Sequence, residues 1–400
     1  MSESRGRWLL ITLLFTGTAL NYVDRQVLAL LKPTLVAEFG WDDAEFGALG
    51  SAFQIAAAGA LLLVGWFVDK VGVRRAYGLA VAVWSAAGMA HALAATVNQF
   101  LAARITLAVA ESVNTPAAVK AAALYLPLRL RSLGLGLVNT APNIGAILTP
   151  LLVPPLALAF GWQAAFVVTG GLGFVWLACW WAGTRSLKIV TTPPRAGEGN
   201  WGALLRDPRS WAVIGAKALS DCNWWFLLFW LPDFFGRQFG MNQATLGWPI
   251  AIIYSMAALG ALSSGLVFPR LLAAGLSVNA ARKGSMLGYA LLILPVPLAV
   301  TATTPLAAAL LIGLALFAHQ GFSTNIFGFA ADAVPPGRVA SVMAAGGLAG
   351  NLTGAATIAL AGWALKTGQG YMPFFAFAAV AYLLATLVVQ LIVPRIVAHE

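Results

Sequence analysis

Long apolar stretches follow one another along almost the whole chain, separated by short polar segments. Each stretch is close to the length of about 20 apolar residues that an α-helix needs to cross a bilayer. Hydropathy and the positions of Gly, Pro and charged residues predict twelve membrane spans, at residues 8–31, 46–68, 76–96, 99–124, 132–157, 162–184, 209–235, 244–268, 284–303, 305–331, 338–365 and 370–394. The pattern predicts an all-α membrane protein.

One long polar interval interrupts this series, and it is rich in Thr, Pro and Gly. Such a composition is typical of a linker rather than a helix. We therefore expect three parts: an N-terminal six-helix half at residues 1–184, a cytoplasmic linker at 185–208, and a C-terminal six-helix half at 209–400. Paired halves of this kind are common in secondary transporters, where the substrate binds between them near the middle of the membrane.

The charged residues report the orientation of the chain in the membrane. Only 10% of the residues are charged, whereas about a quarter are charged in soluble domains. Of the 24 basic residues, only Lys32, Arg237 and Lys366 fall on one predicted side, and most of the others fall on the opposite side. This asymmetry places both termini in the cytoplasm. The net charge of +10 therefore concerns topology, and we expect no nucleic-acid partner.

Two neighbouring charges, Asp24 and Arg25, lie inside the first span. Each charge costs about 2.5–3.5 kcal/mol to insert at the centre of a membrane helix. Adjacent side chains on a helix diverge by about 100°, so the two cannot simply neutralise one another. Each must face a cavity or a partner on another helix, which makes the pair a functional-site hypothesis.

The fourth span carries a second acid and base, Glu111 and Arg104, spaced seven residues apart. Two helical turns put them on one face, about 10 Å apart along the axis, which is too far for a direct ion pair within the helix. The separation suits a substrate carboxylate at one end and a proton site at the other. The alternative is that Asp24, Arg25, Arg104 and Glu111 only lock helices together.

Further polar side chains interrupt the other spans. Asn139 and Asn143 share a helical face and suit either hydroxyl recognition or helix–helix hydrogen bonds. His319 could titrate or could be a satisfied structural histidine. Lys217 and Asp221 have the i, i+4 spacing of an ion pair. The remaining candidate substrate contacts are Tyr22, Gln54, Trp224 or its neighbour Trp225, Tyr254, Gln320, Ser323, Asn325 and Asn351.

The junction of the second and third spans, residues 65–75, carries the most specific motif. It fits the loop motif of the major facilitator superfamily through Gly65, Asp69, Lys70, Gly72, Arg74 and Arg75. We expect Gly65 to allow close approach of a helix, Asp69 to cap or pair with a helix end, and Gly72 to make the turn. Arg74 and Arg75 would anchor the loop at anionic headgroups. The corresponding loop of the second half, residues 265–283, lacks the acid.

The resemblance narrows to the anion:cation symporter branch through residues 21–28 and 115–120, and to bacterial hexuronate transporters through residues 224–232, 277–283 and 319–321. Residues 112–114 and 124–127 depart from the pattern expected there. The resemblance implies that Arg25 binds the substrate anion and that Asp24 and Glu111 carry protons. Under it, Arg104 is either a second anion contact or the ion-pair partner of Glu111.

These observations predict a twelve-helix, two-half carrier that imports a sugar acid, such as galacturonate or glucuronate, together with protons. No phosphate-binding loop or metal-ligand cluster is present in the sequence, so we expect no enzyme and no cofactor other than the coupling proton. The expected surroundings are a bacterial inner membrane, with the protein monomeric. The alternatives are a carrier of an aldonate or another small organic anion, either a symporter or a uniporter, and a non-transporting sensor with a transporter fold.

Overall fold

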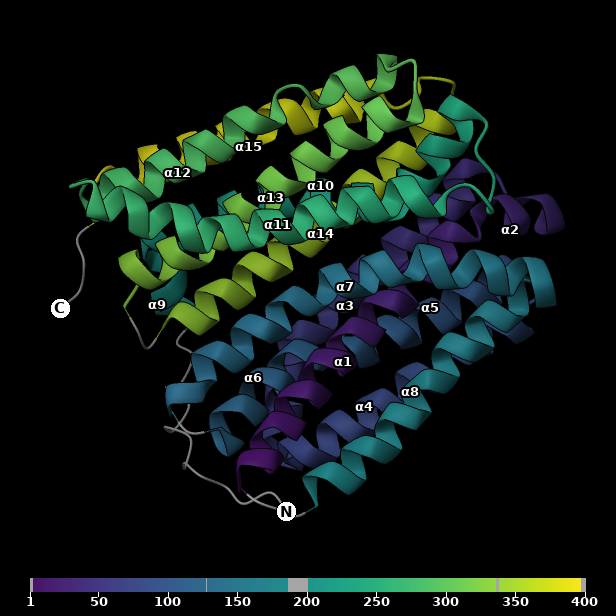
Figure 1. The fold of residues 1–400 in the computed structure, drawn as a ribbon, viewed down its shortest axis with the longest axis horizontal. Coiled ribbons are helices and arrows are strands. Elements are labelled where there is room, and N and C mark those ends of the chain that lie inside the picture. The colour runs from purple at the N-terminus through teal and green to yellow at the C-terminus, as the bar shows by residue number, and fades with distance from the viewer. Residues whose placement is uncertain (1–2, 127, 186–200, 336–337, 397–400) are drawn as a thin grey trace. The chain divides into compact units, whose positions relative to one another are not determined.

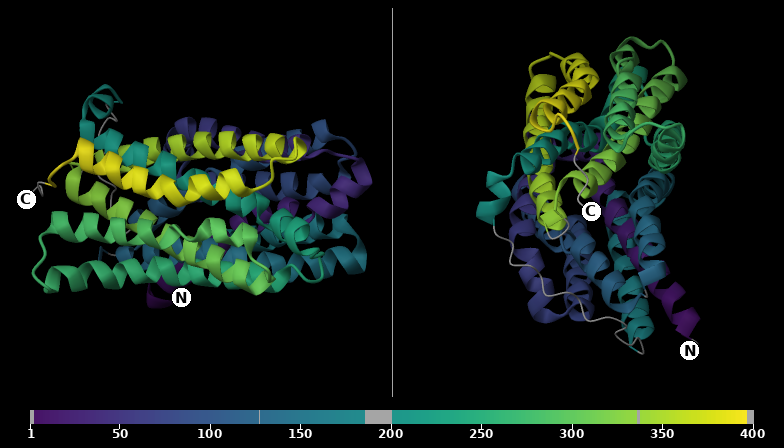
Figure 2. Two further views of the ribbon diagram at one scale, coloured as in Figure 1. Left: turned by 90° about the horizontal axis from the view of Figure 1, so that it is seen from above. Right: turned by 90° about the vertical axis from the view of Figure 1, so that its left-hand side faces the viewer.

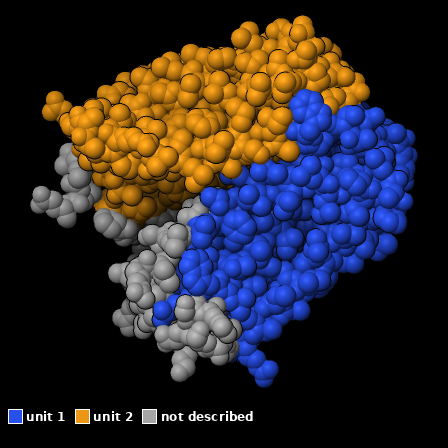
Figure 3. Space-filling model, in the orientation of Figure 1, with its two compact units in different colours: residues 1–195, 242–248 blue, residues 196–241, 249–400 orange. Residues whose placement is uncertain are grey.

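The computed structural model describes residues 3–126, 128–185, 201–335 and 338–396. These residues are almost entirely helical and contain no β-strand (Figure 1). They form two compact units, which Figure 3 shows in different colours: residues 1–195 with 242–248, and residues 196–241 with 249–400. Most of the predicted linker falls on residues 186–200, which lie outside the described residues.

The first unit is a bundle in which the first and third predicted spans each pack against the last one. Its elements are α1 (Glu3–Leu30), α2 (Lys32–Phe39), α3 (Asp43–Val71), α4 (Val73–Ala90), η1 (His91–Leu93), α5 (Val97–Glu111), α6 (Asn114–Tyr125), α7 (Leu128–Phe160) and α8 (Trp162–Thr184). Helix α1 packs against α7 and α8, and α4 packs against α5 and α8. Helix α3 lies against α5, which places the charged residues of α1 and α5 inside one bundle.

The second unit has the same order of long helices. Its elements are α9 (Trp201–Arg206), α10 (Pro208–Phe239), α11 (Gly247–Ala273), α12 (Val278–Ile293), η2 (Val296–Thr301), α13 (Pro305–Ala333), α14 (Val339–Lys366) and α15 (Met372–Ile392). Helix α10 packs chiefly against α14 and α15, and α12 packs against α13 and α15. Within this unit the long helices lie side by side (Figure 2).

Each predicted span corresponds to a helix or a helix pair. Nine helices within the described residues are long and apolar enough to cross a membrane. The remaining predicted spans are α1, α5 with α6, and α10. Helices α5 and α6 are each shorter than 18 residues, whereas α1 and α10 carry the charged residues Asp24, Arg25, Lys217 and Asp221 within their apolar stretches.

The prediction of one continuous helix over 99–124 is wrong. A turn at residues 112–113 separates α5 from α6. Pro116 has no N–H group to donate to the carbonyl of Ser112, so the regular hydrogen-bond ladder stops there. The Ser112 hydroxyl, at the same break, donates to the carbonyl of Ala108 in the preceding turn (2.7 Å). Glu111 consequently lies at the last position of α5, beside the break.

A row of glycines sets the close packing of α10 on α14. Three glycines lie opposite three side chains: Gly346 opposite Lys217, Gly350 opposite Asp221, and Gly354 opposite Trp225. A Cβ atom added at these glycines would lie 2.7, 2.6 and 2.5 Å, respectively, from the facing side chain. Both series have four-residue spacing, so the side chains of one helix fill the positions left empty on the other.

This packing predicts that Gly354→Ala destabilises the protein by about 1–3 kcal/mol, because the indole of Trp225 is buried and cannot move aside freely. Gly347→Ala is the matched control on the same helix, since an added Cβ there meets no described atom within 4 Å. Thermal unfolding in detergent should show a lower Tm for Gly354→Ala only. Equal Tm values for the two variants would contradict the close-packing interpretation.

Candidate functional site

The four charged residues predicted for the site come together in the first unit. Asp24 and Arg25 lie on α1, and Arg104 and Glu111 lie on α5. Asp24, Arg104 and Glu111 are buried, with 4%, 2% and 1% of their surface exposed. Each of these buried groups interacts electrostatically with others of the set. Two acids and two bases therefore share one buried environment, where charges interact strongly.

Arg25 and Glu111 form a direct ion pair. The Nε of Arg25 donates to Oε2 of Glu111 at 2.9 Å, and the Glu111 side chain is completely buried. The guanidinium of Arg25 also lies 5.2 Å from the ring centroids of Tyr22 and Phe53. The direct ion-pair partner of Glu111 in this structure is therefore Arg25, on another helix, while Arg104 interacts with Glu111 at longer range.

Arg104 is the less satisfied of the two guanidinium groups. Its Nε and Nη1 atoms are buried and make no hydrogen bond to any described residue. The Arg104 guanidinium lies over the ring of Phe53, 4.5 Å from its centroid. Buried N–H groups of a charged side chain are costly when they lack acceptors. A guanidinium in this state can bind a carboxylate through two parallel hydrogen bonds.

Asp24 and Gln54 add further buried polar atoms to this cluster. The Oδ2 atom of Asp24 and the Oε1 atom of Gln54 make no hydrogen bond to a described residue. The hydroxyl of Thr169, on α8, lies within hydrogen-bonding reach of Asp24. Buried polar groups are normally satisfied, so a concentration of unsatisfied ones indicates a place built for a ligand, water or a proton.

The second unit brings three predicted substrate contacts together through their rings. The indole of Trp224 stacks on the imidazole of His319, with centroids 5.2 Å apart and planes 12° from parallel. The ring of Tyr254 meets the edge of the same indole at 5.9 Å and 79°. Trp224, on α10, is thus the tryptophan that joins the predicted site residues. Its neighbour Trp225 packs on Gly354 instead.

Other predicted contacts are placed elsewhere. Asn325 is fully buried, where its amide donates to Ser264 (3.0 Å) and its carbonyl accepts from Arg282 (3.4 Å). Asn325 therefore takes part in packing and does not join the ring cluster. Gln320 and Ser323 are partly exposed on α13, while Asn143 and Asn351 are buried on α7 and α14. The side chain of Asn139 lies outside the described part of the structure.

The loop motif at residues 65–75 is partly as expected. Gly72 has φ +84° and both ends α3 and begins α4, which requires glycine. Asp69 pairs with Lys120 of α6. Lys70 lies over the ring of Trp66, 4.8 Å from its centroid. The motif therefore ties the turn between α3 and α4 to a neighbouring helix within the first unit.

One expectation for this motif is wrong. An added Cβ at Gly65 would meet no described atom within 4 Å, because this glycine lies on the exposed face of α3. Arg74 is partly exposed and donates to the Thr184 hydroxyl and the Trp181 carbonyl, both at 3.0 Å. A cation at the C-terminal end of α8 is favoured by the helix dipole. Arg75 remains exposed.

The second unit has an ion pair at its corresponding loop, although the loop itself has no acid. Arg282, at the start of α12, donates to Asp332 of α13 from Nε (3.0 Å) and Nη2 (2.8 Å). The acid comes from a helix fifty residues later in the chain, which the loop sequence alone does not indicate.

Comparison with known proteins decides the family. Residues 14–357 match the Major Facilitator Superfamily. The chain belongs to this superfamily. It is therefore a multi-pass membrane transport protein and not an enzyme, with the two-half facilitator fold.

Individual relatives fit this membership. The chain is 28% identical to a hexuronate transporter of Escherichia coli strain K12, over 96% of this chain and 93% of the relative. It is 26% identical to a D-galactonate transporter of E. coli O6:H1, over 96% and 94%. A bacterial homologue of the human lysosomal transporter Spinster, solved in an inward-facing conformation, has the same fold, with a TM-score of 0.77 at 18% identity over 96% of both chains.

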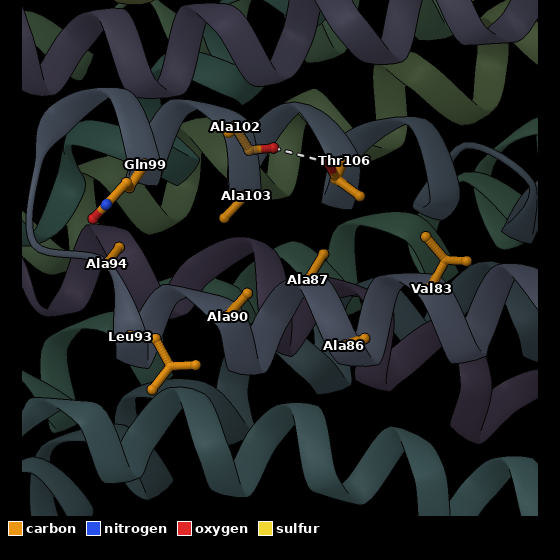
Figure 4. Close-up of a pocket in the computed structure, with 10 residues that line it drawn as sticks. All are labelled: Val83, Ala86, Ala87, Ala90, Leu93, Ala94, Gln99, Ala102, Ala103 and Thr106. Carbon is orange, nitrogen blue, oxygen red and sulfur yellow. Dashed lines mark hydrogen bonds between the residues drawn. The ribbon is translucent and has the colours of Figure 1, made fainter.

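A groove of this facilitator lies apart from the charged cluster and the rings. It has a volume of about 560 Å³ and runs between α4 and α5 (Figure 4). Its lining is Val83, Ala86, Ala87, Ala90, Leu93, Ala94, Gln99, Ala102, Ala103 and Thr106. None of these is charged, and the Thr106 hydroxyl is already bonded to the carbonyl of Ala102 (2.9 Å). This lining offers no group for an anionic substrate.

Lys217 and Asp221 form the ion pair that their spacing predicts, with Nζ and Oδ2 2.7 Å apart. Both side chains are largely buried, at 10% and 15% exposure. Removing one partner from a buried pair leaves an uncompensated charge, whereas replacing both can be nearly neutral.

We expect Asp221→Asn to lower the free energy of unfolding by about 3–5 kcal/mol, because Lys217 is left alone in the protein interior. The double variant Lys217→Met/Asp221→Asn should recover most of this loss. Thermal unfolding of the wild type, both single variants and the double variant forms the required cycle. Additive losses in the double variant would show that the pair does not stabilise the unit.

Proposed function

We propose that this facilitator is a proton-coupled symporter that imports a sugar acid, with a hexuronate such as galacturonate or glucuronate as the favoured substrate. The observation that carries the proposal is the buried Arg25–Glu111 ion pair beside the unsatisfied guanidinium of Arg104. The hexuronate and galactonate transporters among its relatives support the same substrate class. A bacterial inner membrane and cytoplasmic termini agree with the distribution of basic residues.

The ion pair suggests how a proton and a carboxylate bind together. While Glu111 is ionised, its carboxylate occupies Arg25. Protonation of Glu111 removes the charge that holds Arg25, so the guanidinium becomes available to the substrate carboxylate. Arg104 offers a second set of donors nearby. The proton and the anion would therefore favour each other's binding.

Charge balance supports the coupling of one proton to one carboxylate. With both acids ionised, Asp24, Arg25, Arg104 and Glu111 carry no net formal charge. A sugar acid brings one negative charge and a bound proton cancels it, so the loaded cluster stays neutral. Burying a net charge is costly, which favours closure of the carrier only when both are bound or both are absent. A second proton on Asp24 would make the loaded cluster positive unless it is released before closure.

An aldonate is the second candidate substrate of the same class. The D-galactonate transporter among the relatives matches this chain over almost its full length. A carboxylate on a hydroxylated chain fits the same cluster whether the sugar is closed or open. Competition by galacturonate, glucuronate, galactonate and neutral galactose separates these substrates, and the neutral sugar should not compete.

The first experiment measures uptake of labelled galacturonate into proteoliposomes with an imposed inward proton gradient. We expect accumulation above the external concentration that collapses when a protonophore is added. Saturable uptake that ignores the gradient would retain the substrate class but overturn proton coupling. Competition by aldonates without uptake of hexuronates would transfer the assignment to the second candidate.

Glu111→Gln separates substrate binding from coupling. The amide cannot carry the exchanged proton and no longer neutralises Arg25, so we expect exchange of internal for external substrate to persist while gradient-driven accumulation is lost. Arg25→Ala is the contrasting variant, and it should lose both activities by at least about 100-fold because a buried charge-assisted contact is removed. Uphill transport by Glu111→Gln would contradict the role of Glu111.

A further inference from the structure

A chain of hydrogen bonds in the second unit fixes the imidazole of His319. Nδ1 of His319, on α13, lies 2.8 Å from the hydroxyl oxygen of Tyr382, on α15. The same hydroxyl lies 3.3 Å from the backbone carbonyl of Ser220, on α10. His319 and Tyr382 are both buried, at 4% and 2% exposure, so three helices meet at this chain of contacts.

The direction of these bonds follows from what each group can donate. The carbonyl of Ser220 has no proton, so the Tyr382 hydroxyl must donate its only proton there. The oxygen of Tyr382 then accepts from His319, which places a proton on Nδ1. In a neutral imidazole the other nitrogen, Nε2, is an acceptor.

The surroundings favour the neutral ring. Among the described residues His319 makes no ion pair with a carboxylate, and the nearby Asp221 is paired with Lys217. A charged imidazole buried without such a partner is costly. The stacked indole of Trp224 covers a face of the ring and opposes its rotation. Nε2 makes no hydrogen bond to the described part of the chain, so its lone pair is unclaimed.

We propose that Tyr382 is a positioning residue that holds Nε2 of His319 ready to accept a hydrogen bond from a hydroxyl group of the sugar acid. This inference rests on the proposed function and specifies how hydroxyl groups are recognised. A neutral acceptor nitrogen attracts a hydroxyl and repels the lone pairs of a carboxylate, so it selects the sugar body and not the acid group. The indole beside it supplies an apolar surface for the sugar carbons.

Recognition of this kind distinguishes the substrate from an analogue that lacks the recognised hydroxyl group. A site built around a hydrogen-bond acceptor binds poorly to an analogue that lacks the matching donor, because the acceptor is then left unsatisfied. The test therefore compares galacturonate with its monodeoxy analogues, each lacking one ring hydroxyl, as competitors of labelled galacturonate uptake. The ratio of inhibition constants does not depend on the amount of folded protein.

Two variants of His319 separate its two nitrogens. His319→Asn keeps a group near Nδ1 that can reach Tyr382 but removes the Nε2 acceptor. His319→Gln keeps an acceptor near the Nε2 position. We expect one monodeoxy analogue to be about tenfold weaker than galacturonate in the wild type. That ratio should fall towards one in His319→Asn and stay within about threefold of the wild type in His319→Gln.

Tyr382→Phe tests the positioning role, since it removes only the hydroxyl. The same analogue ratio should fall by about three- to fivefold. Tyr289→Phe is the matched control: its ring also packs on α13, but its hydroxyl is bonded to Ser263 (2.7 Å) and not to His319, so its loss should leave the ratio unchanged. If a variant gives too little uptake, stabilisation of the purified protein by each sugar acid in a thermal shift assay gives the same comparison.

The outcomes distinguish this inference from the proposed function. A wild-type protein that neither transports nor is stabilised by any sugar acid would overturn the proposed function and this inference together. Wild-type transport with the same analogue ratio in His319→Asn and Tyr382→Phe would overturn the inference alone. Equal loss of selectivity in Tyr289→Phe would assign the effect to general destabilisation and would also overturn it.

Discussion

The ion pair between Arg25 and Glu111 is the constraint on which the first unit depends. Two opposite charges lie 2.9 Å apart, and the Glu111 carboxylate is fully shielded from solvent. Loss of either partner would remove the direct counter-charge of the other, and breaking a buried pair in this way typically costs about 3–5 kcal/mol. The remaining charges of the cluster are arranged around this contact. Arg104 and Arg25 both lie near the ring of Phe53, but the Nε and Nη1 atoms of Arg104 make no hydrogen bond to a described residue.

The two units carry different chemistry. The first unit concentrates charge, with acids and guanidinium groups brought together from α1 and α5. The second concentrates aromatic rings and hydrogen-bonding groups, with Trp224, Tyr254 and His319 in contact. Two units with the same order of long helices can therefore present quite different side chains.

Local features of this structure follow from sequence spacing, and distant partnerships do not. The twelve spans, the turn at Gly72 and the i, i+4 pair of Lys217 and Asp221 depend on residues close together in the chain. The partner of Glu111 lies 86 residues away, whereas the sequence suggested Arg104 as its possible ion-pair partner and Arg25 as a substrate contact. Tyr382 gave no signal, since a tyrosine near the middle of an apolar helix is equally consistent with packing.

Some errors have the same physical origin. A glycine in a motif indicates either close approach or conformational freedom, and only the packing around it distinguishes these. Gly65 lies on an exposed face. In contrast, facing side chains occupy the space above three glycines of α14 that belong to no recognised motif. The hydrogen bonds of Arg74 to the C-terminal end of α8 also could not be inferred from the sequence of its own loop.

The matched four-residue rows of α10 and α14 also limit how these helices can move. Three facing side chains occupy the spaces above three glycines. A shift by one residue would put Ala345, Ala349 and Thr353 opposite them in one direction and Gly347, Asn351 and Ala355 in the other, so at least two Cβ atoms would meet them. A shift by four residues, about 6 Å along the axis, would keep only two of them above glycines, because the third would meet Val342 or Ile358. Only the observed register places all three side chains above glycines, and sliding of α10 along α14 is therefore opposed in both directions.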